Sequence, residues 1–378
     1  MVAYKPRLIV RPFWYPARMT SLLGLSLLTV GCTIKEPLQV EPFETGVLVF
    51  DERVQPANVS VSFINRQTGL VRFPSPRPGV LATDIFNNQN DRQLNDKVSS
   101  YAEVDGKGFL VSPETGQIEI VESSSFRSIS LLGGAEVPRY VVGVSPLKAY
   151  VSCWGGRTVG PNIAVIDVVA RRLFNSIPVS AGPEQLVVVG DELFVANSGG
   201  SSEVGKTVSI INTTTDQVVT SLSVGDVPTS IAYDPEVNLL YVLCSGRAVS
   251  SSANGLTSAE LVTINPATRQ VTNRVVIGGR PIAGNPTNLT LDLKTKTLYF
   301  LWRGLIYKTT PTATSIPLTQ PVETRSLTNY GFDPSTATLY GATTNKSAKP
   351  GVVLRFQPTG TLIDSISTEA IPTGFYFK

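Results

Sequence analysis

The sequence predicts an all-β protein: a seven-bladed β-propeller with four-stranded blades, in a ring closed by the C-terminal strand pairing with the N-terminal blade. Three observations support this prediction. A strand-rich unit recurs about every 45 residues, an incomplete unit stands at each end, and 31 Gly and 27 Pro indicate many tight turns. A unit of this length cannot bury its apolar face alone, so the copies must pack around a common axis.

The clearest part of the unit is an apolar strand that ends in Asp or Asn. Ile163–Asp167 is followed by a turn and a second apolar segment, Ile177–Val179. The same arrangement recurs as Val208–Asn212 with Leu222–Val224, and as Leu261–Asn265 with Val275–Ile277. Four weaker copies bring the number to seven: Val61–Asn65, Ile118–Glu122, Leu305–Lys308 and Leu354–Gln357.

In each unit, two further strands precede this apolar strand. An aromatic or apolar strand recurs as Phe109–Val111, Ala149–Val151, Leu193–Val195, Leu240–Val242, Leu298–Phe300 and Leu339–Tyr340. The strand before it opens at Pro138, Pro183, Pro228 and Pro286, and at Leu327 in the seventh unit. Proline fits the first residue of an edge strand, where no ladder donor is needed. Each unit therefore holds four strands, as one propeller blade does.

The two ends of the chain hold half-units that complement each other. Pro372–Phe377 repeats the Pro-led strand with nothing after it, and Gly46–Phe50 repeats the aromatic strand with nothing before it. We expect them to pair and close the ring. The propeller domain is predicted over residues 45–378, which gives about 48 residues per blade. A six-bladed ring, with one weak copy as an insertion, is the alternative.

The composition excludes most common enzyme designs. The 378 residues contain no histidine, which excludes a Ser-His-Asp triad, a His-dependent Cys nucleophile and His ligation of zinc or haem. There is no Asp-x-Asp-x-Asp calcium loop and no glycine-rich phosphate loop. We therefore expect no enzyme, no cofactor and no metal.

The net charge gives no reason to expect binding to nucleic acid. The formal charge is +3, but the first 31 residues contain four bases and no acid. Without these four positive charges, the remainder of the chain carries −1. A nearly neutral protein has no bulk electrostatic attraction to nucleic acid.

The N-terminus is predicted to be a lipoprotein signal peptide, residues 1–31. A basic stretch precedes the apolar run Met19–Val30, which as a helix spans only about 18 Å and is too short for a bilayer core of about 30 Å. Leu28–Cys32 resembles the bacterial lipobox, so Cys32 is the predicted lipidation site and residues 32–44 the flexible tether. The alternative is an ordinary signal peptide followed by a chance cysteine.

The candidate binding site is one mouth of the central channel. The first strand of each blade lines the channel, and the loops after the second strands rise at the same end. The candidate ligand-binding residues on these segments are Trp154, Arg157, Asn197, Arg247, Trp302, Arg303, Arg139, Tyr140, Glu184 and Gln185. A flat aromatic side chain beside hydrogen-bonding groups is suited to sugars, corrinoids or peptide side chains, and arginines on the loops suit an anionic group.

Several of these residues also have a purely structural interpretation. Trp154 and Trp302 could pack between blades, Arg139 and Glu184 could form an inter-blade ion pair, and the polar ring could bind only water. The loop Ser245–Ser258 could fold over a ligand or be mobile filler. Cys153 and Cys244 share a register two blades apart, beyond disulfide range, and are predicted to be buried small apolar residues.

Three stretches resemble a known family. Pro183–Val189, Leu193–Gly199 and Gly374–Phe377 are similar to the YncE-like (YVTN-type) seven-bladed β-propellers, above all the surface lipoproteins of Bacteroidetes-type bacteria. The resemblance covers about residues 45–378. Some similar surface lipoproteins capture cobalamin for a TonB-dependent transporter, so the resemblance implies an outer-membrane lipoprotein, on the cell surface or the periplasmic face, with a corrinoid or similar nutrient as ligand.

Three functions remain open at this point. The leading one is a lipid-anchored binding protein that captures a small ligand or partner at one propeller face, beside an outer-membrane transporter. The second is a structural or protein-interaction scaffold of the cell envelope with no small ligand. The third is a carboxylate-based lyase, which would need two convergent acids, and the sequence offers Glu184 with a loop residue such as Glu203.

Overall fold

The computed structural model describes residues 43–52, 59–66, 81–94, 96–201, 203–247, 255–280, 285–344 and 351–378. The predicted signal peptide, Cys32 and the tether up to residue 42 lie outside the described residues, as do residues 248–254 of the Ser245–Ser258 loop. Residues 41–378 form one compact unit. Phe43, which the sequence places in the tether, packs edge-on against the rings of Phe63 and Phe126, with centroids 5.2 and 5.9 Å away.

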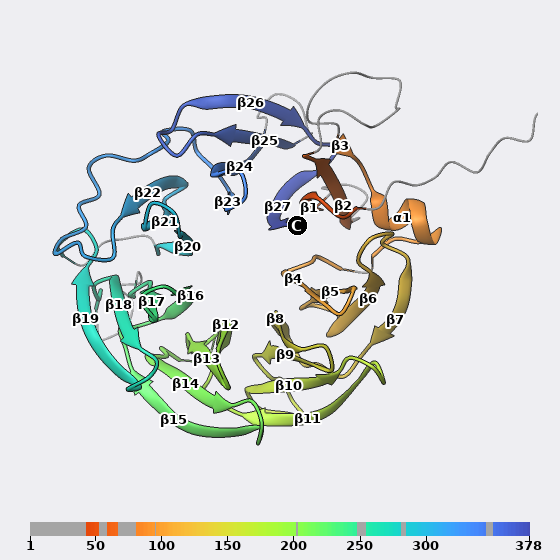
Figure 1. Ribbon diagram of the computed structural model, residues 1–378, viewed down its shortest axis with the longest axis horizontal. Coiled ribbons are helices and arrows are strands. Elements are labelled where there is room, and N and C mark those ends of the chain that lie inside the picture. Colours follow the sequence, from red (N-terminus) through yellow and green to blue (C-terminus); the bar gives the residue numbers. More distant parts are fainter. Residues whose placement is uncertain are drawn as a thin grey trace, which may run out of the picture. The chain divides into compact units, whose positions relative to one another are not determined.

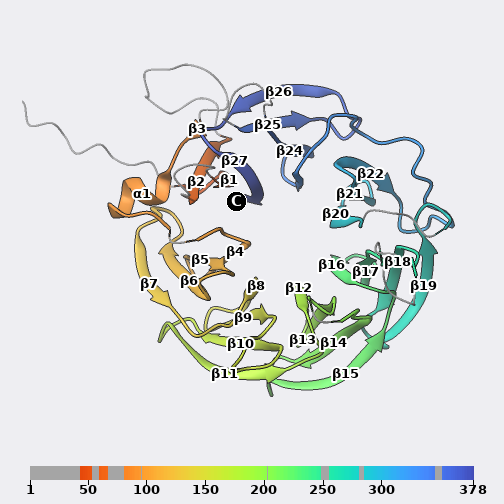
Figure 2. The ribbon, with the colours of Figure 1, turned by 180° about the vertical axis from the view of Figure 1, so that it is seen from behind.

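Seven antiparallel sheets stand around a common axis, so the seven-bladed propeller is confirmed (Figure 1). Seen from behind, the same strand of every sheet lies nearest the centre (Figure 2). Six sheets have four strands and one has three. A single short helix, α1 (Ile85–Asn90), accompanies them in the described part of the chain.

The blades are numbered 1 to 7, starting from the N-terminal blade, and the innermost strand of each is called its inner strand. The inner strands of blades 1 to 7 are β27 (Ile371–Phe377), β4 (Ser100–Val104), β8 (Pro138–Ser145), β12 (Pro183–Val189), β16 (Pro228–Asp234), β20 (Thr287–Asp292) and β23 (Asn329–Asp333). The second strands are β1 (Gly46–Glu52), β5 (Lys107–Ser112), β9 (Lys148–Cys153), β13 (Glu192–Asn197), β17 (Leu239–Cys244), β21 (Thr297–Trp302) and β24 (Thr338–Thr344).

The outer half of each blade contains the third strand and, in six of the blades, an outermost strand. The third strands are β2 (Val59–Asn65), β6 (Gln117–Glu122), β10 (Asn162–Asp167), β14 (Thr207–Asn212), β18 (Glu260–Asn265), β22 (Leu305–Thr309) and β25 (Gly351–Phe356). The outermost strands are β3 (Leu81–Ala82), β7 (Ser128–Leu132), β11 (Arg172–Pro178), β15 (Gln217–Ser223), β19 (Gln270–Val276) and β26 (Leu362–Ser367).

Blade 6 has no named outer strand. The segment after β22 instead makes isolated bridges, Ile277 with Ile316 and Ile306 with Glu323. This segment contains Pro311, Pro317 and Pro321, and each proline removes a backbone donor that a continuous ladder would need.

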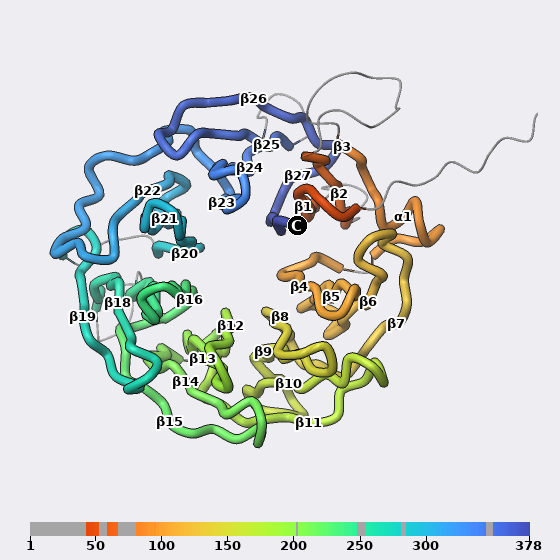
Figure 3. Tube along the Cα trace, viewed as in Figure 1, coloured from red at the N-terminus to blue at the C-terminus, as the bar shows by residue number. Residues whose placement is uncertain are grey.

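The ring closes as the half-units predict. β27 pairs antiparallel with β1 from Val47–Phe377 to Glu52–Ile371, and the tube in Figure 3 shows the blue C-terminal strand beside the red N-terminal one. Phe375 and Phe377 pack against the buried Tyr340 of blade 7, at 5.9 and 5.3 Å between ring centroids. The last strand therefore belongs to blade 1 and also contacts blade 7.

The strand register defines two ends of the ring. In blade 3, Pro138 pairs with Cys153, Cys153 with Asn162, and Asn162 with Pro178. The start of the inner strand and the loop after the second strand therefore lie at the same end, which we call the mouth. The predicted candidate residues lie on these mouth segments.

Candidate functional site

A β-bulge near the start of several inner strands shapes the mouth. The pairing register shifts between Pro138 and Val141 in β8, and between Pro183 and Leu186 in β12; similar shifts occur in β16 and β20. A bulge sets two residues opposite one and breaks the alternation of side chains. Arg139 and Tyr140 lie in the bulge of β8, and Glu184 and Gln185 lie in the bulge of β12.

Blades 3 and 4 bring three candidate residues together: Arg139, Trp154 and Glu184. The Arg139 guanidinium carbon lies 4.5 Å from the centroid of the Trp154 ring, and Arg139 Nε lies 3.3 Å from Glu184 Oε2. The Arg139 side chain is 29% exposed whereas that of Glu184 is 8% exposed. The cluster therefore presents a guanidinium to solvent and keeps its counter-charge beneath it.

Burial and neighbours set the protonation of this cluster. Burial raises the pKa of Glu184, and Arg139, Ser198 and Trp154 lower it in part. The Ser198 hydroxyl donates to Glu184 Oε1 at 3.3 Å. The buried Trp154 Nε1 is close enough to lower the Glu184 pKa but lies outside hydrogen-bond geometry. Burial, with the Glu184 charge, raises the pKa of Tyr140 to about 12, so its phenol stays neutral at physiological pH.

Trp154 belongs to blade 3 but packs on blade 4. A Cβ built on Gly200 would lie 3.3 Å from the Trp154 ring, and one built on Gly182 would lie 1.9 Å from the Gly200 nitrogen. The glycines of blade 4 thus let its backbone approach the indole closely. Trp154 and the Arg139–Glu184 pair both join two blades, as the structural interpretation of these residues predicts, while the Arg139 guanidinium remains reachable.

Other polar residues of the mouth are used between neighbouring blades. Gln185 accepts a hydrogen bond from the Ile231 backbone nitrogen at 3.0 Å, and Asn288 donates to Asn329, which in turn donates to the Thr373 carbonyl. Ser99 donates to the Arg139 carbonyl at 2.6 Å. These bonds form a belt that holds inner strands together, so Gln185 is committed to structure in this arrangement.

The remaining candidates are dispersed around the mouth. Asn197 is fully buried and donates to Thr207 and Ser209 within its own blade, which removes it from the accessible surface. Arg247 donates through Nη2 to Asp226 at 2.8 Å. Arg157 is exposed on the β9–β10 loop.

Trp302 and Arg303 form a compact unit in blade 6. Arg303 and Gly304 have φ of 51° and 76°, which indicates a tight type I′ hairpin turn rather than a long loop. The Arg303 guanidinium carbon lies 5.0 Å from the Trp302 ring, and Trp302 packs edge-on against Tyr307. Among the described residues this is the second arginine–tryptophan contact, and it lies on a blade that does not adjoin blades 3 and 4.

The cysteines behave as buried apolar residues. Cys153 and Cys244 are both fully buried free thiols, which confirms that they form no disulfide with each other. Burial raises the pKa of the Cys153 thiol to about 12 and raises that of Cys244 further above its ordinary value. Neither thiol is suited to nucleophilic chemistry.

Within the described residues, no group of three or more His, Cys, Asp or Glu side chains could hold a metal ion. No helix among them is long and apolar enough to cross a membrane.

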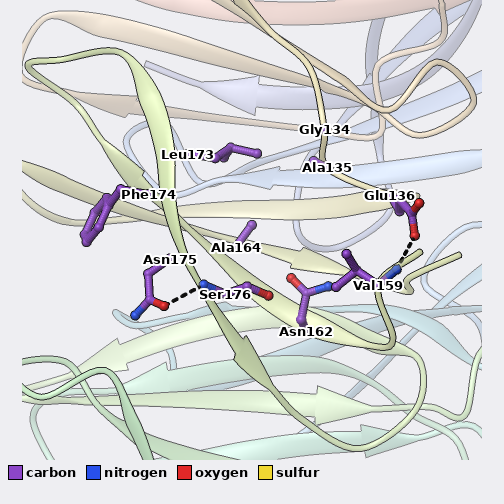
Figure 4. Close-up of a pocket in the computed structure, with 10 residues that line it drawn as sticks. All are labelled: Gly134, Ala135, Glu136, Val159, Asn162, Ala164, Leu173, Phe174, Asn175 and Ser176. Carbon is purple, nitrogen blue, oxygen red and sulfur yellow. Dashed lines mark hydrogen bonds between the residues drawn. The ribbon is translucent and has the colours of Figure 1, made fainter.

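A pocket that the sequence did not indicate lies at the perimeter, between blades 2 and 3 (Figure 4). Its volume is about 440 Å³. It is lined by the β7–β8 connection, the β9–β10 loop and one face of β10 and β11, with the residues Gly134, Ala135, Glu136, Val159, Asn162, Ala164, Leu173, Phe174, Asn175 and Ser176. A break in the alternation of β11, where Leu173 and Phe174 are adjacent, is the sequence signal that could have revealed it.

Solved structures similar to this chain share its fold. A quinonprotein alcohol dehydrogenase-like protein from Bacteroides thetaiotaomicron matches with a TM-score of 0.64 at 11% identity, over 89% of this chain and 79% of that one. A hypothetical selenium-binding protein from Sulfolobus tokodaii matches with 0.62 at 10% identity, over 91% and 94%. A protein from Bacteroides fragilis provisionally named a 6-phosphogluconolactonase matches with 0.59 at 11% identity, over 91% and 100%.

At these identities the similarity shows a propeller fold and nothing finer. Neither a protein-family model nor a curated protein sequence matches the chain.

Proposed function

We propose that this protein is a lipid-anchored binding protein of the bacterial cell envelope, which captures a small ligand at the mouth beside blades 3 and 4. Arg139, Tyr140 and Trp154 are the proposed contact residues, and Glu184 positions Arg139. The observation that supports this is the partly exposed Arg139 side chain, whose guanidinium is held between an indole face and a buried carboxylate.

Such a guanidinium is preorganised for binding. Its rotamer is restrained by Glu184 and Trp154, so a ligand need not pay the full entropy of ordering a long side chain. The arginine, the indole and the neutral Tyr140 phenol together suit a flat ligand with acceptor groups at its edge. A corrinoid or similar nutrient, which the family resemblance implies, has this chemistry, and the lipobox at Cys32 fits delivery to an outer-membrane transporter.

Binding is proposed in preference to catalysis. The Glu184 carboxylate already pairs with Arg139 and accepts from Ser198, whereas a carboxylate lyase would need it free beside a second acid. Glu203, the sequence-based partner for that role, is exposed on the β13–β14 loop.

Calorimetric titration of the chain with cyanocobalamin tests the proposal. We expect the unmutated chain to bind, and Arg139→Gln or Trp154→Ala to weaken binding at least tenfold, about 1.4 kcal/mol. The matched control is Arg269→Gln: Arg269 also pairs with a glutamate of another blade, Glu192, at 2.6 Å, but at the end opposite the mouth. It should change the affinity less than about twofold.

If cyanocobalamin does not bind, native mass spectrometry of the protein purified from its own membranes decides between the remaining cases. A small molecule that co-purifies with the unmutated chain and is lost in Arg139→Gln keeps capture at the mouth and removes the corrinoid. No such molecule would refute ligand capture.

The scaffold alternative is favoured by one observation, the belt of hydrogen bonds in which Gln185, Asn288 and Asn329 are used between blades. It predicts that an envelope protein co-purifies with the chain, and that Arg139→Gln leaves this association unchanged.

A further inference from the structure

The end of the ring opposite the mouth, which we call the bottom face, is where the described chain begins. The Phe43 backbone N–H donates to the Ser124 carbonyl, in the β6–β7 turn of this face. The first strand, β1, starts there as well, since Gly46 accepts a hydrogen bond from the Lys378 N–H at the end of the inner strand. The segment that precedes Phe43 is therefore joined to the domain at the bottom face.

The predicted tether is short compared with the domain. Phe43 follows the predicted lipidation site, Cys32, by eleven positions, which span at most about 36–40 Å when fully extended. A seven-residue strand such as β1 is about 23 Å long. A lipid on Cys32 can therefore bring the bottom face onto a bilayer without stretching the tether, whereas turning the mouth to the bilayer would use more than half of that length.

The three most exposed large apolar side chains in the described part of the chain all lie on the bottom face. They are Leu147 in the β8–β9 turn, Val169 in the β10–β11 turn and Val237 in the β16–β17 turn, with exposures of 64, 62 and 53%. In the described mouth loops the corresponding residues are Val159 and Leu256, both 40% exposed.

The turn that holds Val169 does not need an apolar residue. The Val169 N–H donates to Asp167 Oδ1 at 3.0 Å, and at the same place in blade 4 the Thr214 N–H donates to Asn212 Oδ1 at 3.0 Å. The same turn thus forms with a threonine where blade 3 has a valine.

The turn that holds Val237 would be better bonded with a threonine. The β16–β17 and β23–β24 turns both begin with an aspartate whose Oδ1 accepts the N–H two residues later, at 3.0 Å. One residue further on, blade 7 has Thr336, whose hydroxyl donates to Asp333 Oδ2 at 2.9 Å, and blade 5 has Val237. Valine gives up this hydrogen bond, so turn formation does not explain it.

Several charged side chains of the bottom face are paired with one another across neighbouring blades. The pairs are Lys148–Asp216, Glu192–Arg269, and Lys296 with both Asp234 and Glu236, at 2.6–2.9 Å. The carboxylate of Glu236, next to Val237, is therefore neutralised by Lys296. Two exposed bases stand close to apolar turn residues in the sequence, Arg171 after Val169 and Lys294 after Leu293.

We propose that the bottom face rests on a lipid surface, with Leu147, Val169 and Val237 in its interfacial region. Arg171 and Lys294 then lie beside lipid phosphates. Exposed apolar side chains accompanied by bases are typical of proteins that bind at the membrane interface. A fluid surface accommodates apolar tips on separate blades, whereas a protein partner favours a contiguous patch.

This inference rests on the lipid anchor of the proposed function, and it gives the mouth an orientation. With the bottom face on the lipid, the mouth faces away from it and is open to a ligand that arrives from the aqueous side.

Fluorescence quenching in vesicles tests the inference on the full-length lipoprotein purified from membranes, after its intact mass has shown whether Cys32 carries lipid. An NBD fluorophore is attached at Val237→Cys, and the matched control is Val159→Cys at the mouth. The native Cys153 and Cys244 thiols are buried and stay unlabelled. In vesicles of phosphatidylethanolamine and phosphatidylglycerol, added doxyl-phosphatidylcholine should quench the label at position 237 at least about twofold and leave the label at position 159 nearly unchanged.

The unmutated lipoprotein provides a second measurement that does not depend on a variant. Trp154 and Trp302 are the tryptophans of the chain after Cys32, and both lie at the mouth, so brominated lipids should leave their emission unchanged.

The possible failures are distinguishable. Equal quenching of the two labels, or quenching of the tryptophans, overturns the inference and leaves the anchor intact. An unlipidated Cys32 refutes the anchor and this inference together. A label at position 237 that is shielded from solvent in native membrane fragments but not in lipid vesicles overturns the inference in favour of a protein partner on the bottom face.

Discussion

Lys378 provides a sensitive test of ring closure. Its Nζ lies 2.8 Å from Glu103 Oε1 and donates to the Ser123 carbonyl at 2.7 Å, with only 3% of the side chain exposed. These contacts join blade 1, to which β27 belongs, to blade 2. We predict that Lys378→Met, which keeps the aliphatic stem and removes the charge, destabilises the whole domain.

The magnitude follows from what the substitution leaves unpaired. Removing one member of a buried ion pair costs about 3–5 kcal/mol. Glu103 is 28% exposed and still accepts from the Tyr101 hydroxyl at 2.9 Å, so leaving it without Lys378 costs less than that. The substitution also removes the hydrogen bond to the Ser123 carbonyl. Together the two losses amount to about 2–3 kcal/mol. For a domain of this size, with an unfolding entropy of about 2.1 cal/mol/K per residue, that corresponds to a fall in Tm of about 3–4 °C.

Thermal unfolding at a fixed scan rate, with Lys107→Met as control, is the assay. Lys107 pairs with Asp105 at 3.0 Å inside the β4–β5 hairpin, and that aspartate is 51% exposed. A surface pair of this kind contributes about 0–1 kcal/mol, so the control should melt within about 2 °C of the unmutated chain. If Lys378→Met melts as the control does, the C-terminal strand does not hold the ring closed in the way described.

Three further predictions follow from single observations. Gly182→Ala should lower the free energy of unfolding by more than about 3 kcal/mol, because its φ is 64° and its new Cβ would lie 1.9 Å from the Gly200 nitrogen. Gly106→Ala, at φ 70° with nothing within 4 Å of the new Cβ, should lower it by about 1 kcal/mol. Urea unfolding of the two variants compares these values. The raised pKa of Glu184 means that the folded state binds the proton more tightly. Stability should therefore fall as the pH rises from about 4.5 through that pKa, and melting curves of Glu184→Gln should lack this decline. In a Cys32→Ser background, Cys153 and Cys244 should resist Ellman's reagent until the protein is denatured, because both thiols are fully buried.

The repeat made most of the strands predictable. The apolar third strand appears in all seven blades and ends in Asp or Asn in four of them, and the Pro-led strands begin where the prolines indicate, as in β8 and β12. The inner strand of blade 2, β4, was not predicted, because it has no leading proline and starts at Ser100. Helix α1 was not predicted, because its six residues are too few to show a helical period in the sequence.

The sequence predicts which residues lie at the mouth but not which contacts their side chains make. Strand order alone placed Arg139, Trp154 and Glu184 at one end of the ring. It could not show that Asn197 is directed into its own blade or that Arg247 is paired with Asp226, because a side chain's direction at a strand end depends on bulges and turn geometry. Such local irregularities cost little energy and leave weak marks in a sequence.

In a repeat protein, a residue explained by the fold should have counterparts in the other blades. The outer-strand bulges and the Asx turns at Asn212 and Asn265 meet this criterion, so they need no function. The Arg139–Trp154 pair does not, since the equivalent positions hold Glu184 and Ser198 in blade 4, and Thr229 and Ser245 in blade 5. Because blades 4 and 5 form without an arginine and a tryptophan at these positions, we expect Arg139→Gln and Trp154→Ala to affect ligand binding more than stability.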